Sequence, residues 1–593
     1  MTTTDKTSCR ILSSLLQAHG VEEVVISPGS RNTPIILALD ANKQIRKRLV
    51  IDERVAAFVA LGIAQTCSRP VAIVCTSGTA LLNYAPAVAE AYYQGLPLIV
   101  ISADRPMQWI DQDDSQTIRQ HDALSNIVKK SYDIPEFSAD DSEMTWYANR
   151  VINDALLEAC DRRRGPVHIN IQLNQPLSDT IEVNESDERK ISSLKTLATI
   201  DSSVLEPIIS EIRGQKTLII GGFHGLSNEI NQSLRQLSMH DNIVVLTETI
   251  SNVKGGNIYT NIDRIIAPLS EEELETLRPD IVISFGGALV SRYVKQFLRK
   301  CRPLRHFSIG FNHTTVDCFK SLTDRVDIAP ETFFSLLVGT VRTNTDTQDR
   351  DRTVDKTKMA TDEVISYASL WKKHNADSLE SHERFIAECP WSDLKAFSVV
   401  AEALQRSERR HVISLSNGTP IRYFQLFDGM NYSACYCNRG VSGIDGSTST
   451  AIGTTIGITD IITDATSVLI TGDMSFSYDI GALATKFIPD NFKIIVLNNS
   501  GGGIFRFIPS TARLPQLEKY FAVNPGIKID KLAEAYDFTH FVADSQEQLE
   551  DVIDRFLSHE HKAILEIVTP PDVSGEILRQ YMNRKKHSTH IKI

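Results

Sequence analysis

Short apolar runs that alternate with helical patterns constrain the fold of this 593-residue chain more than any other feature. In the first third, such runs lie at 22–27, 48–52, 70–77, 97–103 and 165–173. They lack the polar alternation of half-exposed strands, which indicates strands buried on both faces of a parallel sheet. Because helical patterns separate them, this part of the chain is predicted to be an α/β domain.

The same alternation occurs twice more along the chain. Four runs form a second unit, at 216–222, 242–248, 279–287 and 305–310. Four runs form a third unit, at 411–418, 467–473, 492–499 and 562–570. Polar stretches near 178–193 and 341–358 separate the units, as linkers do.

We therefore predict an α/β protein of three consecutive three-layer domains with mainly parallel sheets. The first domain is expected at residues 1–185 and a central Rossmann-like domain at 195–340. A linker is expected at 341–385 and the last domain at 386–593.

Composition narrows the class of protein. With 42% hydrophobic and 23% charged residues the chain is typical of soluble globular proteins. Its net charge is −12 and no long basic run occurs, so we expect no nucleic-acid partner. No stretch approaches 18 apolar residues and no signal peptide is evident, so we expect no membrane span and a cytoplasmic location. The nine cysteines are scattered, as reduced thiols are.

One stretch, "GDMSFSYDIGALATKFIPDNFKIIVLNNSGGGIF" at 472–505, places polar side chains after two apolar runs. Asp473 follows one run and Asn499 ends the other, and ligands of open parallel sheets bind beyond the carboxyl ends of strands. A carboxylate, an amide oxygen and a backbone carbonyl suit Mg²⁺. Glycines 501–503 would let a diphosphate approach the backbone. Taken singly, each feature could also be a helix cap or a turn.

The order Gly-Asp, helix, strand and Asn-Asn resembles the diphosphate-binding motif of thiamine-diphosphate enzymes, with Met474 in place of the usual second glycine. The resemblance implies that Asp473, Asn499 and the carbonyl of Gly501 bind the Mg²⁺ (or Mn²⁺) of thiamine diphosphate. It also implies a pyrimidine-binding (PYR) domain first and a diphosphate-binding (PP) domain last. Because this superfamily holds its cofactor between subunits, a homodimer or homotetramer is expected.

Glu53 is the candidate catalytic residue, since it follows a strand and begins an apolar helix. In thiamine-diphosphate enzymes a carboxylic group bonded to the aminopyrimidine ring makes proton transfer within the cofactor possible. The alternative is a carboxylate that only stabilises the start of its helix. The resemblance places five more residues at the cofactor: Gly78, Ile444, Ser475, Ile504 and Phe505.

Seven segments, in order, resemble the 2-succinyl-5-enolpyruvyl-6-hydroxy-3-cyclohexene-1-carboxylate synthases of menaquinone biosynthesis. They are "SPGSRNTPI", "IDERVAAFVALGIAQ", "TSGTA", "SADRP", "SQTIRQ", "NRGVSGIDGSTSTAIG" and "NNSGGGIF". The resemblance implies decarboxylation of 2-oxoglutarate and 1,4-addition of the resulting succinyl-semialdehyde carbanion to isochorismate, with release of CO₂. This is a carbon–carbon bond-forming transferase reaction of the Stetter type.

Both substrates are dicarboxylates, and arginine is suited to bidentate carboxylate binding. Several arginines follow predicted strands. By the family pattern the substrate pocket would include Ser30, Arg31, Arg105, Gln116, Arg422 and Arg439, with Arg292 from the middle domain. Gly418 stands where the family usually has serine, so Ser416 or Thr419 would have to supply that hydroxyl.

Three alternatives stay open. One is another thiamine-diphosphate carboligase or decarboxylase of 2-oxo acids, such as a relative of acetolactate synthase. A second is a non-catalytic binding protein with the same fold, although Glu53, Asp473 and Asn499 are all present. A third is an NAD-dependent oxidoreductase, whose G-x-G-x-x-G motif is incomplete in "GGFHG" at 221–225.

Overall fold

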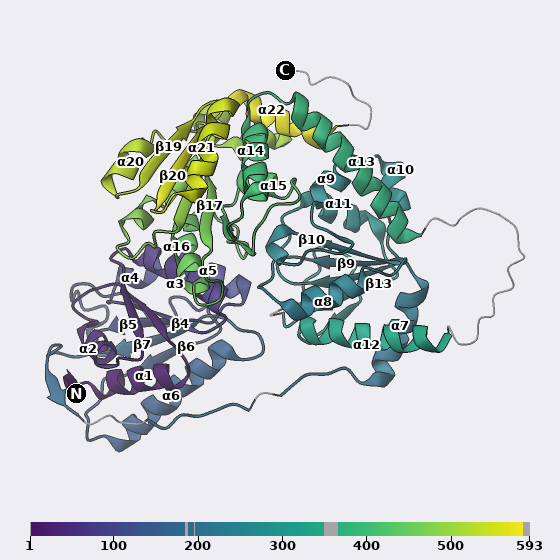
Figure 1. Cartoon of the computed structure of the whole chain (residues 1–593). Helices are drawn as coiled ribbons and strands as arrows, with labels where there is room; N and C mark the ends of the chain where they lie inside the picture. The colour runs from purple at the N-terminus through teal and green to yellow at the C-terminus, as the bar shows by residue number, and fades with distance from the viewer. Residues whose placement is uncertain (1, 184–187, 195, 313, 349–365, 585–593) are drawn as a thin grey trace, which may run out of the picture.

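The computed structural model describes residues 2–183, 188–194, 196–312, 314–348 and 366–584. It contains three six-stranded sheets, each in its own domain, and all strand pairs within them are parallel (Figure 1). The predicted fold of three consecutive parallel α/β domains is confirmed. In the described residues, no helix is both long enough and apolar enough to cross a membrane.

The first domain has six parallel strands with helices on both faces. The strands are β2 (Glu23–Ile26), β3 (Arg46–Leu49), β4 (Val71–Cys75), β5 (Leu98–Asp104), β6 (Ser131–Ile134) and β7 (Val167–Gln172). The helices are α1 (Thr7–Ala18), α2 (Thr33–Ala41), α3 (Glu53–Cys67), α4 (Thr79–Asn83), α5 (Ala85–Gln94) and α6 (Ser142–Cys160). A separate antiparallel pair, β1 (Thr2–Thr4) and β8 (Thr180–Glu182), joins the beginning and end of this domain.

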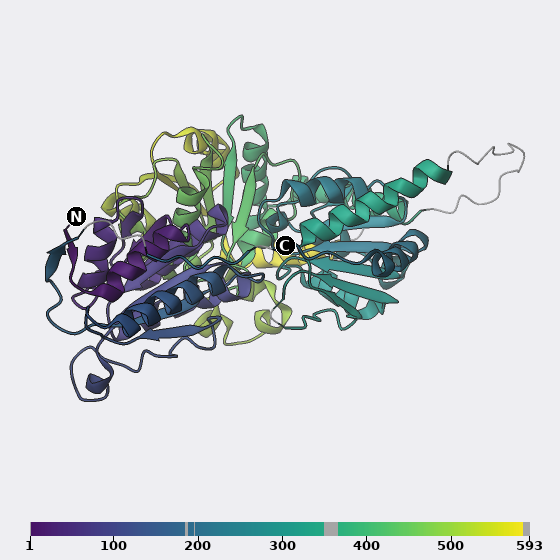
Figure 2. The same cartoon turned by 90° about the horizontal axis from the view of Figure 1, so that it is seen from below.

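The second domain has the strand order β11-β10-β9-β12-β13-β14, which is the doubly wound order of Rossmann folds. Its strands are β9 (Thr217–Gly221), β10 (Ile243–Thr247), β11 (Ile258–Tyr259), β12 (Ile281–Phe285), β13 (Arg305–Ile309) and β14 (Asp324–Val326). Its helices are α7 (Ser202–Gly214), α8 (Asn228–Leu237), α9 (Ile262–Ile266), α10 (Glu271–Thr276), α11 (Arg292–Cys301) and α12 (Pro330–Gln348). Figures 1 and 2 both show this domain beside the other two.

The third domain has strands β15 (His411–Leu415), β16 (Ala434–Cys437), β17 (Thr466–Gly472), β18 (Phe492–Asn498), β19 (Thr539–Ala543) and β20 (Ala563–Val568). Its helices are α14 (Asp393–Arg406), α15 (Thr419–Phe424), α16 (Ser447–Ile458), α17 (Asp473–Tyr478), α18 (Gly503–Phe507), α19 (Pro509–Ala512), α20 (Ile529–Ala535), α21 (Gln546–Ser558) and α22 (Pro571–Met582). Its strand order, β16-β15-β17-β18-β20-β19, matches strand for strand the order β3-β2-β4-β5-β7-β6 of the first domain.

The segment 341–385, which the sequence suggests as a linker, is largely helical where it is described. Its first residues end α12, and most of its last part belongs to α13 (Tyr367–Glu388). Tyr367 and Trp371 of α13 are buried with the core of the second domain, while His382 contacts Tyr581 of the third. This connection is a helix because it has apolar side chains to bury on both domains.

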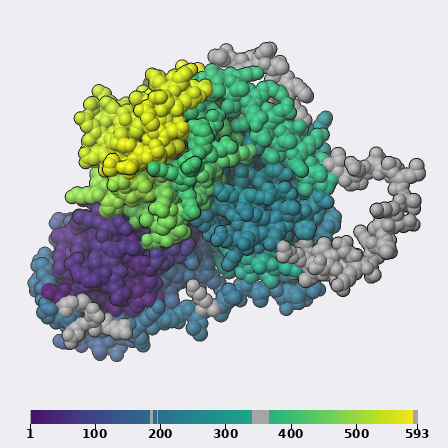
Figure 3. Space-filling model, viewed as in Figure 1, coloured from purple at the N-terminus to yellow at the C-terminus, as the bar shows by residue number. Residues whose placement is uncertain are grey.

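The first and third domains share one hydrophobic core, and Figure 3 shows their surfaces in direct contact. Helices α3 and α16 cross there at close range. A β-carbon on Gly62 would lie 2.0 Å from the carbonyl oxygen of Thr450, and one on Gly453 would lie 2.0 Å from that of Val59. Only glycine at these two positions allows the backbones to approach so closely.

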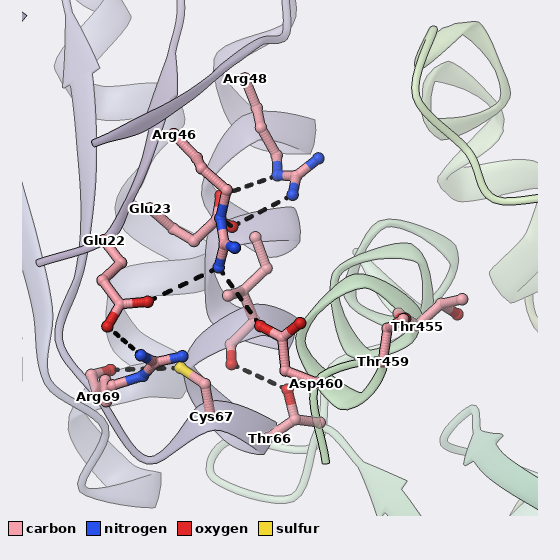
Figure 4. A network of polar contacts seen from close by, with 11 residues as sticks. Glu22, Glu23, Arg46, Arg48, Thr66, Cys67, Arg69, Thr455, Thr459 and Asp460 are labelled. Carbon is pink, nitrogen blue, oxygen red and sulfur yellow. Dashed lines mark hydrogen bonds and ion pairs between the residues drawn. The ribbon is translucent and has the colours of Figure 1, made fainter. Parts of the chain in front are cut away.

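Ion pairs close another part of the same interface. Arg46 lies between three carboxylates, with Glu23 at 2.5 Å, Asp460 at 3.4 Å and Glu22 at 3.8 Å (Figure 4). Asp460 follows α16 and the other residues belong to the first domain, so this network joins the two domains. It is half-exposed and contributes less than the shared core.

Candidate active site

Asp473 lies at the carboxyl end of β17, beside the end of the neighbouring strand β18. Its carboxylate accepts hydrogen bonds from the backbone nitrogens of Gly501 at 2.6 Å and of Met474 at 2.7 Å. Burial raises the pKa of Asp473 to about 6, although these two N–H groups favour the charged form. A cation bound here would offset the cost of keeping the buried carboxylate ionised.

Asn499 is buried and held in one orientation by Asp393. Its Nδ2 donates to Asp393 Oδ2 at 2.8 Å, which leaves the amide oxygen Oδ1 for another partner. Asp393 is also buried, begins α14 and accepts from Thr569 Oγ1. Sequence reasoning missed Asp393, because an aspartate after Ser392 at a helix start is usually a capping residue.

The carbonyl oxygen of Gly501 already has one hydrogen-bond partner. Arg506 Nη1 donates to it at 2.6 Å, while Arg506 Nη2 lies 2.7 Å from Glu518 Oε2. A carbonyl oxygen has two lone pairs, so a second partner can still bind. Asp473, the Asn499 oxygen and this carbonyl together form a hard-oxygen donor set that suits Mg²⁺ or Mn²⁺. The three residues therefore fit the metal that the sequence suggests.

The predicted apolar residues flank this donor set. Ile444 is 38% exposed, and its carbonyl accepts a hydrogen bond of 2.6 Å from Ser475 Oγ. Ile504 and Phe505 are half-buried at the start of α18, and the ring of Phe505 lies 5.6 Å from that of Phe521. Side chains that are partly open in the single chain can still contact a ligand.

In the first domain, Glu53 begins α3, and Asp52 caps the helix by accepting from Val55 N at 3.2 Å. The Glu53 carboxylate is half-buried and accepts from Asn83 Nδ2 at 3.1 Å. Gly78 follows β4 with φ +84°, and its backbone nitrogen donates to Gln120 Oε1 at 2.6 Å. A residue with a side chain would be strained at that φ value.

The first-domain arginines converge at the carboxyl ends of β2 and β5. Arg31 is buried, and its Nη1 donates to the carbonyl oxygen of Leu173 at 2.8 Å. Burial lowers the pKa of Arg31, and the nearby charge of Arg105 lowers it further. Arg105 pairs with Asp114 at 2.6 Å, and Gln116 donates to the carbonyl oxygen of Ser77 at 3.3 Å. Ser30 is exposed beside Arg31.

The other three predicted arginines come from the second and third domains. Arg439 is buried, and its Nη1 donates to Asn417 Oδ1 at 2.8 Å. Burial lowers the pKa of Arg422, the charges of Arg439 and Arg292 lower it further, and the carboxylates of Asp263 and Glu248 raise it. Arg292 begins α11 of the second domain, and its guanidinium lies 5.7 Å from the ring centre of Phe507 in the third.

Arg439 also has an unused donor. Among the described residues, its buried Nε has no hydrogen-bond partner. Unpaired buried donors are rare and costly in folded proteins. An acceptor such as a carboxylate would satisfy it, so this part of the site fits an anionic ligand.

Gly418 has φ +99°, a value that favours glycine over the serine that the family resemblance suggests at this position. Ser416, one possible substitute, is buried and its Oγ accepts from Gly472 N at 3.4 Å. Asn417, between them, donates through Nδ2 to the carbonyl oxygens of Asn438 and Gly443. Asn417 therefore braces the loop that carries Arg439 and Ile444.

The structure brings the predicted residues together in two groups. One, in the first domain, contains Ser30, Arg31, Glu53, Gly78, Arg105 and Gln116. The other, in the second and third domains, contains Arg292, Arg422, Arg439, Ile444, Asp473, Ser475, Asn499, Gly501, Ile504 and Phe505. Within the described chain, no hydrogen bond or ion pair joins a member of one group to a member of the other.

Both outer domains match models of known families. Residues 7–124 match the N-terminal thiamine pyrophosphate (TPP) binding domain of thiamine pyrophosphate enzymes. Residues 421–567 match the C-terminal TPP binding domain. The two candidate groups therefore lie in or beside domains that bind thiamine diphosphate.

Whole-chain comparison is more specific. The chain is 36% identical to a 2-succinyl-5-enolpyruvyl-6-hydroxy-3-cyclohexene-1-carboxylate synthase of Porphyromonas gingivalis, over 97% of each protein. It is 36% identical to that of Flavobacterium johnsoniae, over 96% of this chain and 97% of the relative. The chain belongs to this family of synthases. The synthase of Bacteroides thetaiotaomicron is 33% identical, over 98% of this chain and 99% of the relative.

A solved structure supports the fold of this synthase family member. The X-ray structure of a proposed thiamin diphosphate-dependent enzyme from Mycobacterium smegmatis superposes with a TM-score of 0.66. It covers 96% of this chain and all of the other, at 17% identity. At that identity the likeness shows the fold alone.

Proposed function

We propose that this protein converts 2-oxoglutarate and isochorismate into 2-succinyl-5-enolpyruvyl-6-hydroxy-3-cyclohexene-1-carboxylate and CO₂. Family membership over nearly the whole chain supports the reaction. The observation that carries the choice of anionic substrates is the group of guanidiniums at Arg292, Arg422 and Arg439, with a buried unpaired nitrogen on Arg439. Guanidinium groups bind carboxylates in two-pronged geometry.

Thiamine diphosphate, when bound, supplies the carbon nucleophile that makes decarboxylation of a 2-oxo acid possible. Asp473, the Asn499 side-chain oxygen and the Gly501 carbonyl would hold its Mg²⁺ (or Mn²⁺). Asp393 accepts from Asn499 Nδ2 and would thereby keep the Asn499 oxygen turned toward that position. Ser475, Ile444 and Gly78 would contact the cofactor itself.

Glu53 would hold a proton at the pyrimidine end of the cofactor. Among the described residues, its one hydrogen bond comes from Asn83, which leaves its other oxygen available. Arg31, Arg105, Gln116 and Ser30 would bind substrate carboxylates from the same side. Ile504 and Phe505 would exclude water from the reacting carbon.

The two groups of residues must meet, and a second copy of the chain would bring them together. We infer a homodimer or a larger assembly in which the first domain of one subunit faces the third domain of its partner. The face around Glu53 carries exposed apolar side chains, with Ile51 78% and Leu49 57% exposed. Covering such side chains favours association. The nine cysteines, all within the described residues, are free thiols, which fits a cytoplasmic enzyme.

An assay with the purified protein, thiamine diphosphate and Mg²⁺ tests this function. We expect CO₂ release from 2-oxoglutarate, and formation of the cyclohexene carboxylate only when isochorismate is added. Pyruvate is the control substrate, because it lacks the second carboxylate that the arginines would bind. Release of CO₂ from pyruvate and not from 2-oxoglutarate would contradict the proposal and favour an acetolactate-synthase-like enzyme.

A further inference from the structure

Two buried glutamates from different domains each hold a pair of consecutive backbone N–H groups. Glu90, on α5 of the first domain, accepts from Gly440 N at 2.5 Å and from Val441 N at 2.8 Å. Glu248, after β10 of the second domain, accepts from Val290 N at 2.7 Å and from Ser291 N at 2.7 Å. Both glutamates are 1% exposed or less.

The two held segments meet at Arg439. One of them begins directly after Arg439. The other begins directly after Leu289, whose carbonyl oxygen accepts from Arg439 Nη2 at 3.3 Å. Because Nη1 donates to Asn417, the Arg439 guanidinium is positioned by residues of the second and third domains. The backbone that follows Arg439 is held by Glu90 of the first domain.

Packing leaves the held segments little freedom. A β-carbon on Gly440 would lie 2.6 Å from the carbonyl oxygen of Glu90, so the loop after Arg439 lies directly on α5. On the other side, Ser291 caps α11 by accepting from Val294 N at 3.1 Å and donates to the buried Asp263. Each segment is therefore fixed to a helix as well as to a glutamate.

Holding a loop with buried glutamates lowers the folding stability of the protein. In the part of the chain that the structure describes, neither forms an ion pair, and a buried carboxylate without one costs stability. Burial raises the pKa of Glu90, and it raises that of Glu248 to about 7. A purely structural contact could be made by apolar or neutral side chains, and the charge of Arg439 favours the ionised form of Glu248, so these two carboxylates point to a task beyond folding.

We propose that Glu90 and Glu248 are positioning residues that together fix the guanidinium of Arg439 for a substrate carboxylate. This inference rests on the proposed function, in which Arg439 binds substrate. The inference adds that the first domain, through Glu90, and the second domain, through Glu248, both affect how tightly Arg439 of the third domain binds substrate.

The variants Glu90→Gln and Glu248→Gln test it. Glutamine keeps the shape but places an NH₂ group against a backbone N–H, which loosens the held segment. We expect each to raise the KM of one or both substrates about tenfold. Thiamine diphosphate affinity, measured by calorimetry, should stay within about twofold of wild type.

Glu23→Gln is the matched control: Glu23 is also buried, pairs with Arg46 and Arg48, and lies away from both segments. Its KM values should not change.

A double-mutant cycle separates positioning from general destabilisation. If the glutamates act through Arg439, each should change KM by less than about twofold in an Arg439→Lys background. An unchanged KM in both single variants, or the full tenfold rise in the Arg439→Lys background, would overturn the proposal. Failure of both variants to fold would also overturn it, because it would assign the glutamates to folding. A wild-type enzyme without turnover on the two substrates would instead contradict the proposed function.

Discussion

Glu53 combines a fixed position with an available oxygen. It is the first residue of α3, its helix is capped by Asp52, and Asn83 is its hydrogen-bond partner. A carboxylate that must exchange a proton with a ligand needs this arrangement, since extra partners within the protein would compete for its lone pairs.

Replacing Glu53 by glutamine removes the proton acceptor and keeps the shape. We expect kcat to fall about 10²- to 10⁴-fold, the range for loss of a general acid–base group. Circular dichroism and calorimetry should show normal folding and thiamine diphosphate binding. Glu22→Gln, at an exposed ion pair, serves as control and should keep wild-type kcat. Wild-type-like turnover in Glu53→Gln would rule out its assigned role.

Residues whose position follows from a nearby strand could be predicted from the sequence. Asp473 comes directly after an apolar run and Arg31 lies in the loop that follows another, and both lie beyond the carboxyl end of a strand in the structure. Asp393, Glu90 and Glu248 could not be found this way. Their partners lie 106, 350 and 42 residues away in the chain, and only tertiary packing brings them together.

Among the helices, α3 and α16 connect stability to the site most directly. Their glycines allow backbone contact between the first and third domains, and α3 begins at Glu53. A shift of α3 would therefore move Glu53 as well as open the shared core.

Gly62→Ala tests this contact. The added methyl group would lie 2.0 Å from the Thr450 carbonyl oxygen, so the helices must separate. We expect a loss of about 1–3 kcal/mol in unfolding free energy, measured with denaturant, together with lower kcat. Gly214→Ala, at the end of α7 with open space around it, should be neutral. Unchanged stability in Gly62→Ala would show that the interface can relax.

Helix α16 also depends on a buried aspartate at its first turn. Asp479 accepts from Ser449 N at 2.7 Å and from Ser449 Oγ at 2.8 Å, and burial raises its pKa to about 6. Between about pH 4 and pH 6 the unfolded chain releases this proton first, so the contribution of Asp479 to stability falls as pH rises.

The variant Asp479→Asn removes that titration. We expect the stability of wild type relative to Asp479→Asn to fall by about 2 kcal/mol between pH 4 and pH 6.5. Denaturant unfolding of both proteins at the two pH values measures the difference. A difference that grows with pH would contradict the sign of the shift.

At the scale of the whole molecule, the two groups of candidate site residues must come together to form one complete active site. The two groups of site residues lie in different domains, and no described hydrogen bond or ion pair joins them. The first-domain group would then meet its counterpart on a second copy.

Co-expression of Glu53→Gln and Asp473→Asn tests this arrangement. Each variant alone should be nearly inactive. If sites form between subunits, half of the randomly mixed dimers would contain one intact site, and about a quarter of wild-type activity should return. Size-exclusion chromatography with light scattering would confirm the dimer. No recovery in isolated mixed dimers would place each site within a single chain.

The matching strand order of the outer domains has a consequence for how such a molecule could arise. In both domains the contacting helix, α3 or α16, joins the second strand of the domain to the third. The two domains therefore contact each other through equivalent surfaces. Two subunits of a symmetric dimer, once fused by gene duplication, would leave this arrangement. Repeating the same pairing between two chains would then require no new type of surface. A contact that once formed between separate molecules would be kept within one polypeptide.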